Sequence, residues 1–128
     1  RLKANKGFPL FGTCAGMILM AKQVTTNGMP TLGMMDIEVR RNAFGRQVNS
    51  FESDVLMPIL GTTPFPGVFI RAPLIEQCDE NVEILGRLVD DTIVAARQGD
   101  LLVTSFHPEL TNDTRLHQFF LDMISKKA

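Results

Sequence analysis

The sequence predicts one domain of mixed helix and strand, in the α/β or α+β class. Three observations support this prediction: an apolar strand followed at once by a helix near the start, several strand-like segments through the middle, and one amphipathic helix at the end. The 128 residues suffice for one hydrophobic core and not for two. Because no internal repeat or linker-like segment occurs, we treat residues 1–128 as a single unit.

The first half of the sequence begins with an expected strand and helix. Residues 8–11 form an apolar run of the size of a buried strand, which ends at Gly12. Residues 15–23 are rich in Ala, Met and Leu, which favour a helix. Residues 25–30 contain Thr, Asn, Gly and Pro and predict a turn. Residues 34–41 alternate between apolar and charged side chains, so we expect a half-exposed strand there.

The second half is expected to be rich in strands. Residues 42–51 are polar and contain glycine, so they predict a loop. Short strands are expected at residues 67–70, 82–88, 92–97 and 101–106. Residues 98–100 (Gln-Gly-Asp) predict a hairpin turn between the last two strands. Thr111 or Asn112 is expected to cap a closing helix that runs to about Ser125, because apolar residues recur along it at helical spacing.

The bulk composition excludes several classes of function. Hydrophobic residues make up 45% and charged residues 21% of the chain, which is typical of a globular protein. The formal net charge is −1, so neither nucleic acid nor an anionic membrane surface is the expected partner. No apolar run is long enough to cross a membrane, and we expect no signal peptide. The two cysteines, Cys14 and Cys78, form no disulfide framework and no metal-ligand spacing, which favours a reduced, cytoplasmic protein without a metal or other cofactor.

Cys14 is the candidate nucleophile. Residues 12–16 (Gly-Thr-Cys-Ala-Gly) have the form of a nucleophile elbow at the junction of the strand and the helix, with sulfur in place of a hydroxyl. So sharp a turn strains the backbone and requires tiny neighbours, which Gly12 and Gly16 supply. The helix that begins near Ala15 directs its N–H groups at the sulfur, which would favour the thiolate and stabilise an oxyanion. The alternative is a small buried apolar cysteine, and this motif alone does not separate the two.

His107 is the candidate base for this thiol. It stands where the apolar run 101–106 opens into a loop, a position at which scaffolds often hold functional residues. Glu109 lies two residues further on, so in extended backbone its carboxylate would point to the same side and orient the imidazole. Pro108 restricts the backbone between them. A purely structural histidine is the alternative, and it is the presence of Cys14 that favours catalysis.

The remaining histidine and cysteine have weaker cases. His117 lies in the closing helix without such a partner, which indicates a surface or packing residue. Cys78 has no glycines around it and has acidic neighbours that would raise its pKa, so we interpret it as structural.

These motifs together resemble those of a known family. Residues 12–16 and 107–109 resemble the class I glutamine amidotransferases, whose triad is Cys, His and Glu. Longer stretches narrow the resemblance to the glutaminase subunits of pyridoxal 5′-phosphate synthases, and these are residues 41–47, 50–52, 69–73 and 105–111. The similarity extends from Phe8 to Phe120, almost the whole chain.

The resemblance implies both a fold and a reaction. The fold would be a flavodoxin-like three-layer α/β architecture. The reaction would be hydrolysis of L-glutamine to glutamate and ammonia through a thioester on Cys14, with His107 and Glu109 completing the triad and the Ala15 N–H binding the oxyanion. The ammonia would pass to a barrel-shaped synthase subunit that builds pyridoxal 5′-phosphate.

The resemblance also implies a binding site for glutamine. It places Arg41 and the pair Ile70 and Arg71 at the bound substrate, where an arginine fork suits a carboxylate and a backbone group can hydrogen-bond the ligand. Structural or surface ion pairs are the alternative for the two arginines. We carry no role over to Arg46, for which loop stabilisation and partner contact are equally consistent.

The sequence departs from this family at its front. The family has an upstream Gly-Gly-Glu-Ser loop that supplies the second oxyanion donor, and these 128 residues do not contain it. We therefore expect further strands and the other half of the oxyanion hole to lie upstream of Arg1. Because one such donor is worth about a hundredfold in rate, we expect weak activity from this stretch alone. The alternatives are a non-catalytic subunit that only binds the synthase and a γ-glutamyl peptidase-like hydrolase.

Overall fold

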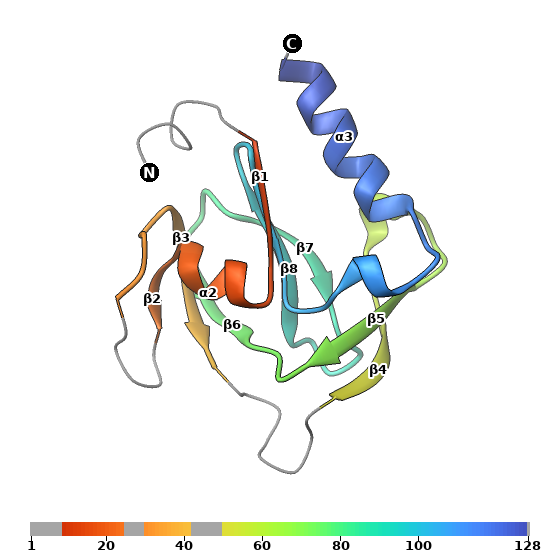
Figure 1. Cartoon of the computed structure of the whole chain (residues 1–128), viewed down its shortest axis with the longest axis horizontal. Helices are drawn as coiled ribbons and strands as arrows, with labels where there is room; N and C mark the ends of the chain where they lie inside the picture. The colour runs from red at the N-terminus through yellow and green to blue at the C-terminus, as the bar shows by residue number, and fades with distance from the viewer. Residues whose placement is uncertain (1–8, 25–29, 42–49, 128) are drawn as a thin grey trace.

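Figure 1 shows a computed structural model of the chain, which describes residues 9–24, 30–41 and 50–127. Its elements, in chain order, are β1 (Leu10–Thr13), α2 (Ala15–Met20), β2 (Ala21–Val24), β3 (Met35–Arg40), β4 (Ser50–Val55), the 3₁₀ turn η1 (Pro58–Leu60), β5 (Phe65–Ile70), β6 (Leu74–Cys78), β7 (Glu83–Arg87), β8 (Ile93–Gln98), β9 (Leu101–Thr104), the 3₁₀ turn η2 (Pro108–Leu110) and α3 (Arg115–Lys127). The prediction of an α/β fold is confirmed.

The described strands form one mixed seven-stranded sheet and a separate hairpin. The main sheet has the order β1-β9-β8-β6-β3-β2, and β7 pairs with β8 away from this path. Within it β1 pairs in parallel with β9 and β2 with β3, while the other neighbours are antiparallel. The hairpin consists of β4 and β5, which pair antiparallel along their full length. The described sheet is therefore mixed rather than uniformly parallel.

Strand β9 lies in the middle layer of three. Leu101 and Val103 are buried in the core cluster that contains Met17 and Met20 of α2. Leu102 is buried in the other cluster, with Leu116 and Met123 of α3. Because successive side chains of a strand point to opposite faces, the two helices cover opposite faces of the sheet. In Figure 1 they accordingly lie on either side of β1.

Most of the expected strands and the hairpin turn are confirmed. The alternation in residues 34–41 becomes β3, in which Met35, Ile37 and Val39 are fully buried. The expected hairpin joins β8 to β9 through Gly99, which has a φ of 59°. Strand β5 begins two residues earlier than expected, at Phe65. The expectations for residue 8, for the turn at residues 25–29 and for the loop at residues 42–49 lie outside the described residues.

The first helix is shorter than predicted. It ends at Met20 rather than Gln23, and Ala21 has an extended conformation with φ −64° and ψ 155°. Residues 21–24 instead form β2, which pairs in parallel with β3 and buries Ala21 and Val24. The helix propensity of Ala21-Lys22-Gln23 is therefore overridden by sheet pairing, as tertiary context routinely does.

Strands β4 and β6 were not predicted. In β4 the polar residues Ser50, Glu52 and Asp54 face solvent, so the segment lacks the apolar composition of a buried strand. The closing helix also begins later than expected, at Arg115 instead of just after Thr111. The Thr111 N–H donates to the carbonyl of Pro108 at 3.3 Å, so this residue closes the 3₁₀ turn η2 rather than capping α3.

Candidate active site

Cys14 stands on a strained turn between β1 and α2. Its backbone has φ 47° and ψ −100°, which a non-glycine residue rarely adopts. A Cβ on Gly12 would lie 2.7 Å from Sδ of Met20 and 3.0 Å from the backbone carbon of Gly16, so a larger residue here would force Met20 and the turn to shift. A Cβ on Gly16 itself would meet nothing within 4 Å. The predicted elbow is present, but only the first of its glycines is needed for space.

The thiol of Cys14 is held in its protonated form. The residue is 8% exposed, and Sγ donates to the backbone carbonyl of Ser105 at 2.9 Å. Burial, and after it the charge of Glu109, raises the pKa of the Cys14 thiol to about 11. The expected thiolate is therefore wrong for the resting site. The helix that follows has only six residues, and the sulfur points at a carbonyl instead of at helix N–H groups.

Strand β9 brings the second half of the candidate triad to the cysteine. Thr13 pairs with Thr104, and the Cys14 N–H donates to the Thr104 carbonyl at 2.8 Å. Beyond β9 the chain bends, because the Thr104 hydroxyl donates to the carbonyl of Phe106 at 2.8 Å. His107 follows directly on this bend, two residues after Ser105, whose carbonyl accepts from Sγ of Cys14.

His107 and Glu109 form the expected pair. Nδ1 of His107 lies 2.8 Å from a carboxylate oxygen of Glu109, with side-chain exposures of 23% and 51%. The backbone between them is the 3₁₀ turn η2 rather than the expected extended chain. Partial burial alone would raise the pKa of Glu109, but its own N–H, the His107 hydrogen bond and the charges of His107 and His117 hold it below the ordinary value.

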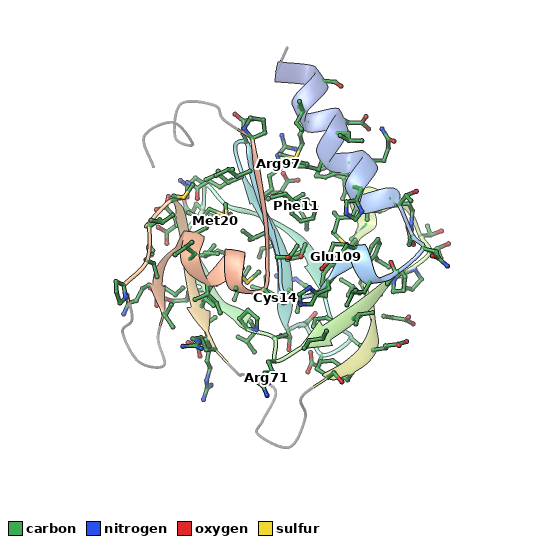
Figure 2. The ribbon with its side chains drawn as sticks, in the orientation of Figure 1. Phe11, Cys14, Met20, Arg71, Arg97 and Glu109 are labelled. Carbon is green, nitrogen blue, oxygen red and sulfur yellow. The ribbon has the colours of Figure 1, made fainter. Side chains whose placement is uncertain are left out.

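Strand β5 lies against His107, the candidate base. The His107 N–H donates to the carbonyl of Val68 at 2.8 Å. Ile70, two residues further along β5, therefore lies on the same edge and is 40% exposed. Arg71 follows it with a φ of 46°, a second strained non-glycine residue beside the site. In Figure 2 the labelled Arg71 lies at the turn after β5, while Cys14 and Glu109 lie nearer the centre.

The other expected site residues, Ala15 and Arg41, are located by the elements next to them. Ala15 is the first residue of α2, so its N–H is among the helix groups without an intrahelical acceptor. Arg41 directly follows β3, where Arg40 pairs with Leu74 at the start of β6. Arg46 lies outside the described residues.

The second histidine and the second cysteine lie where the sequence indicated. His117 is exposed on α3, with its ring 6.0 Å from that of Phe11. Cys78 is partly buried, and this burial is the main reason that its pKa is raised, with Asp79 adding to the effect and Arg87 opposing it.

Three backbone and hydroxyl groups at the site were not foreseen. The carbonyl of Ser105 holds the thiol, the carbonyl of Val68 holds His107, and the Thr104 hydroxyl shapes the bend. The buried hydroxyls of Thr104 and Ser105 stand in an otherwise apolar run, and this signal in the sequence could have drawn attention to them.

The described residues hold neither a metal centre nor a membrane span. No three His, Cys, Asp or Glu side chains in residues 9–24, 30–41 and 50–127 are grouped so as to bind a metal ion. Within those same ranges, no helix has the length and apolarity to cross a bilayer. A hollow of about 660 Å³ lies between the β4–β5 hairpin and residues 110–113, and none of the triad residues lines it. The candidate triad offers a thiol, an imidazole and a carboxylate, the kinds of group that nucleophilic acyl transfer uses.

Comparison with known proteins gives consistent matches. A family model described as the SNO glutamine amidotransferase family matches residues 2–126. The pyridoxal 5′-phosphate synthase subunit PdxT of Herpetosiphon aurantiacus is 57% identical over 124 residues, which are 94% of this chain and 65% of that protein. The subunit of the same name from Pelotomaculum thermopropionicum is 57% identical over 116 residues, which are 91% of this chain and 59% of that protein.

A solved structure is similar as well. A crystal structure described as a glutamine amidotransferase superposes with a TM-score of 0.89 at 49% identity and covers 97% of this chain and 65% of its own. The chain thus spans less than two thirds of the length of each of these relatives.

Proposed function

Because this chain belongs to the SNO glutamine amidotransferase family, we propose that it carries the triad with which a glutaminase hydrolyses L-glutamine to glutamate and ammonia. The observation that carries the proposal is the 2.8 Å contact between His107 and Glu109, set beside a cysteine on a strained strand-to-helix turn. Each of the three side chains has a role in this reaction.

The first half of the reaction forms a thioester. Nδ1 of His107 is bonded to Glu109, which leaves Nε2 to take the thiol proton as Sγ of Cys14 attacks the side-chain amide carbon of glutamine. The carbonyl electrons move to oxygen, and the N–H of Ala15 stabilises the oxyanion. The C–N bond then breaks, and the imidazolium gives its proton to the leaving nitrogen, which departs as ammonia.

The second half releases glutamate. His107 takes a proton from water, whose oxygen attacks the thioester carbon, and the C–S bond breaks. The sulfur regains its proton from the imidazolium, so the site returns to its resting thiol. Glu109 fixes the tautomer of the ring throughout and stabilises its cationic form. The lowered pKa of Glu109 keeps it ionised for this task at neutral pH.

Glutamine is held by the rim of the site in this proposal. The backbone of Ile70 binds the substrate next to the base, and the guanidinium groups of Arg41 and Arg71 bind its α-carboxylate. The exposure of Ile70 and Arg71 and the strained backbone of Arg71 support an open rim.

The names of the relatives indicate the setting of this activity. The relatives are subunits of pyridoxal 5′-phosphate synthase, so we assign to this chain a cytoplasmic role in vitamin B6 biosynthesis. A barrel-shaped synthase subunit would be its partner and would receive the ammonia. Residues 1–128 would form one domain, the C-terminal portion of the glutamine amidotransferase unit.

The test is ammonia release from glutamine by the natural protein that carries this chain, mixed with its synthase. The Cys14→Ala variant is expected to abolish release, because no other group forms the thioester. The matched control is Cys78→Ala, which removes the other, partly buried cysteine and is expected to leave release unchanged. Ammonia release by Cys14→Ala at the wild-type rate would contradict the proposal.

A further inference from the structure

The guanidinium of Arg115 joins two chain segments at the start of α3. Its Nη1 donates to the carbonyls of Thr63 and Leu60 at 2.8 and 3.4 Å, and its Nη2 donates to the carbonyl of Pro64 at 3.0 Å. Asp113 accepts from Nε at 3.0 Å and from Nη2 at 2.7 Å. The planar fork of the side chain is thus used in full, and we call this arrangement the Arg115 junction.

The junction is connected to the turn that carries Glu109. The Asp113 N–H donates to the hydroxyl of Thr111 at 3.3 Å, and that hydroxyl donates to the carbonyl of Pro108 at 3.2 Å. Pro108 and Glu109 are consecutive residues of η2. The side chains of Arg115 and Asp113 are 28% and 20% exposed, so this ion pair is better shielded from water than a surface pair.

The junction is also connected to the strand that holds His107. The Arg115 guanidinium lies 5.7 Å from the centre of the Phe65 ring, at the first residue of β5. The Phe65 ring lies 5.6 Å from that of Phe106, which directly precedes His107. Further along β5, the carbonyl of Val68 accepts the His107 N–H. Contacts therefore lead from Arg115 to Glu109 through η2 and to His107 through β5.

We propose that Arg115 is a positioning residue of the glutaminase reaction, one that keeps His107 and Glu109 in hydrogen-bonding register by fixing η2 and β5 to each other. This inference rests on the proposed function, since it assigns the pair a catalytic task. Arg115 touches neither the thiol nor the substrate in this account. It acts on the reacting atoms only through the segments that it joins.

The geometry predicts that the effect falls on kcat rather than on KM. Arg115 contacts β5 at Phe65, and Ile70 lies five residues away, which is on the order of 17 Å along a strand. The ladder with β4 runs along the whole of β5 and pairs Ile70 with Ser50, so the glutamine-binding end keeps this support without the junction. The turn η2, which carries Glu109, lies outside that ladder. Loosening of the junction therefore misplaces the base while the substrate rim keeps its support.

The experiment compares two substitutions at the junction with a matched control in the natural protein and its synthase. Arg115→Lys keeps the positive charge but loses the planar fork, and Asp113→Asn keeps the shape but loses the charge. The control is Arg97→Lys, since Arg97 also stacks on a phenylalanine at 5.7 Å and donates to a backbone carbonyl, that of Gly99 in the turn between β8 and β9.

Two readouts are combined. For both junction variants, kcat for ammonia release is expected to fall between about tenfold and a hundredfold, with KM for glutamine within about twofold, because small misplacements of a catalytic group have costs of this size. Hydrogen exchange is expected to speed up at the amides of Leu110 and Thr111, which close η2 onto His107 and Pro108. Arg97→Lys is expected to change neither.

The inference is overturned if both junction variants keep kcat within about twofold of wild type. A fall in kcat in step with a rise in KM and a lowered unfolding midpoint would assign Arg115 a merely structural role and overturn it equally. A third outcome separates this inference from the proposed function. If the wild type releases no ammonia, the proposed function is wrong. Faster exchange at Leu110 and Thr111 in Arg115→Lys would then still show that Arg115 stabilises η2.

Discussion

Burial of Cys14 opposes the deprotonation that a nucleophilic thiol requires. Sulfur attacks as the thiolate, yet this residue is 8% exposed and its thiol donates to the carbonyl of Ser105. Burial first, and the charge of Glu109 second, raise its pKa to about 11. The resting residue is therefore a thiol, and in the proposed reaction its proton moves to His107 only as the substrate is attacked.

This balance predicts slow alkylation of Cys14 near neutral pH. The difference between the ordinary thiol pKa of 9.0 and about 11 corresponds to roughly a hundredfold smaller thiolate fraction at pH 7. The rate of reaction with iodoacetamide, followed by peptide mass spectrometry in a Cys78→Ala background, is expected to keep rising with pH until it passes about 11. Reaction at pH 7 as fast as that of a free cysteine peptide would show that the thiol is not held in this way.

At the scale of elements, the turn between β1 and α2 depends on one of its two glycines. Gly12 has no room for a Cβ, because Met20 and the backbone of Gly16 lie within 3.0 Å of where it would be. The bend at Cys14, which has a φ of 47°, is thus closely packed on the side of Gly12 and open on the side of Gly16.

Substitution of each glycine by alanine tests whether space for a Cβ is limiting at Gly12 and not at Gly16. Gly12→Ala is expected to lower the free energy of unfolding by about 1–3 kcal/mol through overpacking. Gly16→Ala is the matched control, since its Cβ meets nothing within 4 Å and alanine favours the helix by up to about 1 kcal/mol. Urea unfolding of the natural protein measures both changes, and equal losses at the two positions would contradict this account of the turn.

The sequence allowed the members of the candidate triad to be proposed, but not the way in which they are supported. The glycines around Cys14 and the spacing of His107 and Glu109 are local patterns, and local patterns are readable. The contact of His107 with Val68, by contrast, joins residues that only the fold brings together. The 3₁₀ turn at η2 was missed for a related reason, since Pro108 is compatible with both extended and turn backbone.

At the scale of the whole molecule, the short strand β9 lies inside the sheet that forms the middle layer of the fold. Its residues are buried alternately against α2 and against α3, and its end leads directly into the bend before His107. The apolar run at residues 101–106 indicated this buried strand, but the strand ends at Thr104 rather than at Phe106. Strand β4 was missed because half of its side chains face solvent and are polar, and β2 because its residues favour a helix in isolation.

The layered core predicts that truncation of a buried and of an exposed leucine lowers the free energy of unfolding by very different amounts. Leu102 is fully buried between β9 and α3, so Leu102→Ala is expected to lower the free energy of unfolding by about 2–5 kcal/mol. Leu121 on α3 is 54% exposed, and Leu121→Ala is expected to change the free energy of unfolding by less than about 0.5 kcal/mol. Chemical unfolding measures both, and a loss at Leu121 equal to that at Leu102 would contradict the assignment of α3's inner face.

The most direct test of the central claim is detection of the covalent intermediate on Cys14. The natural protein and its synthase are mixed with glutamine, quenched in acid within the first turnover and digested, and the peptides are analysed by mass spectrometry. We expect a γ-glutamyl thioester on the peptide that contains Cys14. Ammonia release without any adduct on Cys14, or an adduct on Cys78 instead, would contradict the claim that Cys14 is the nucleophile.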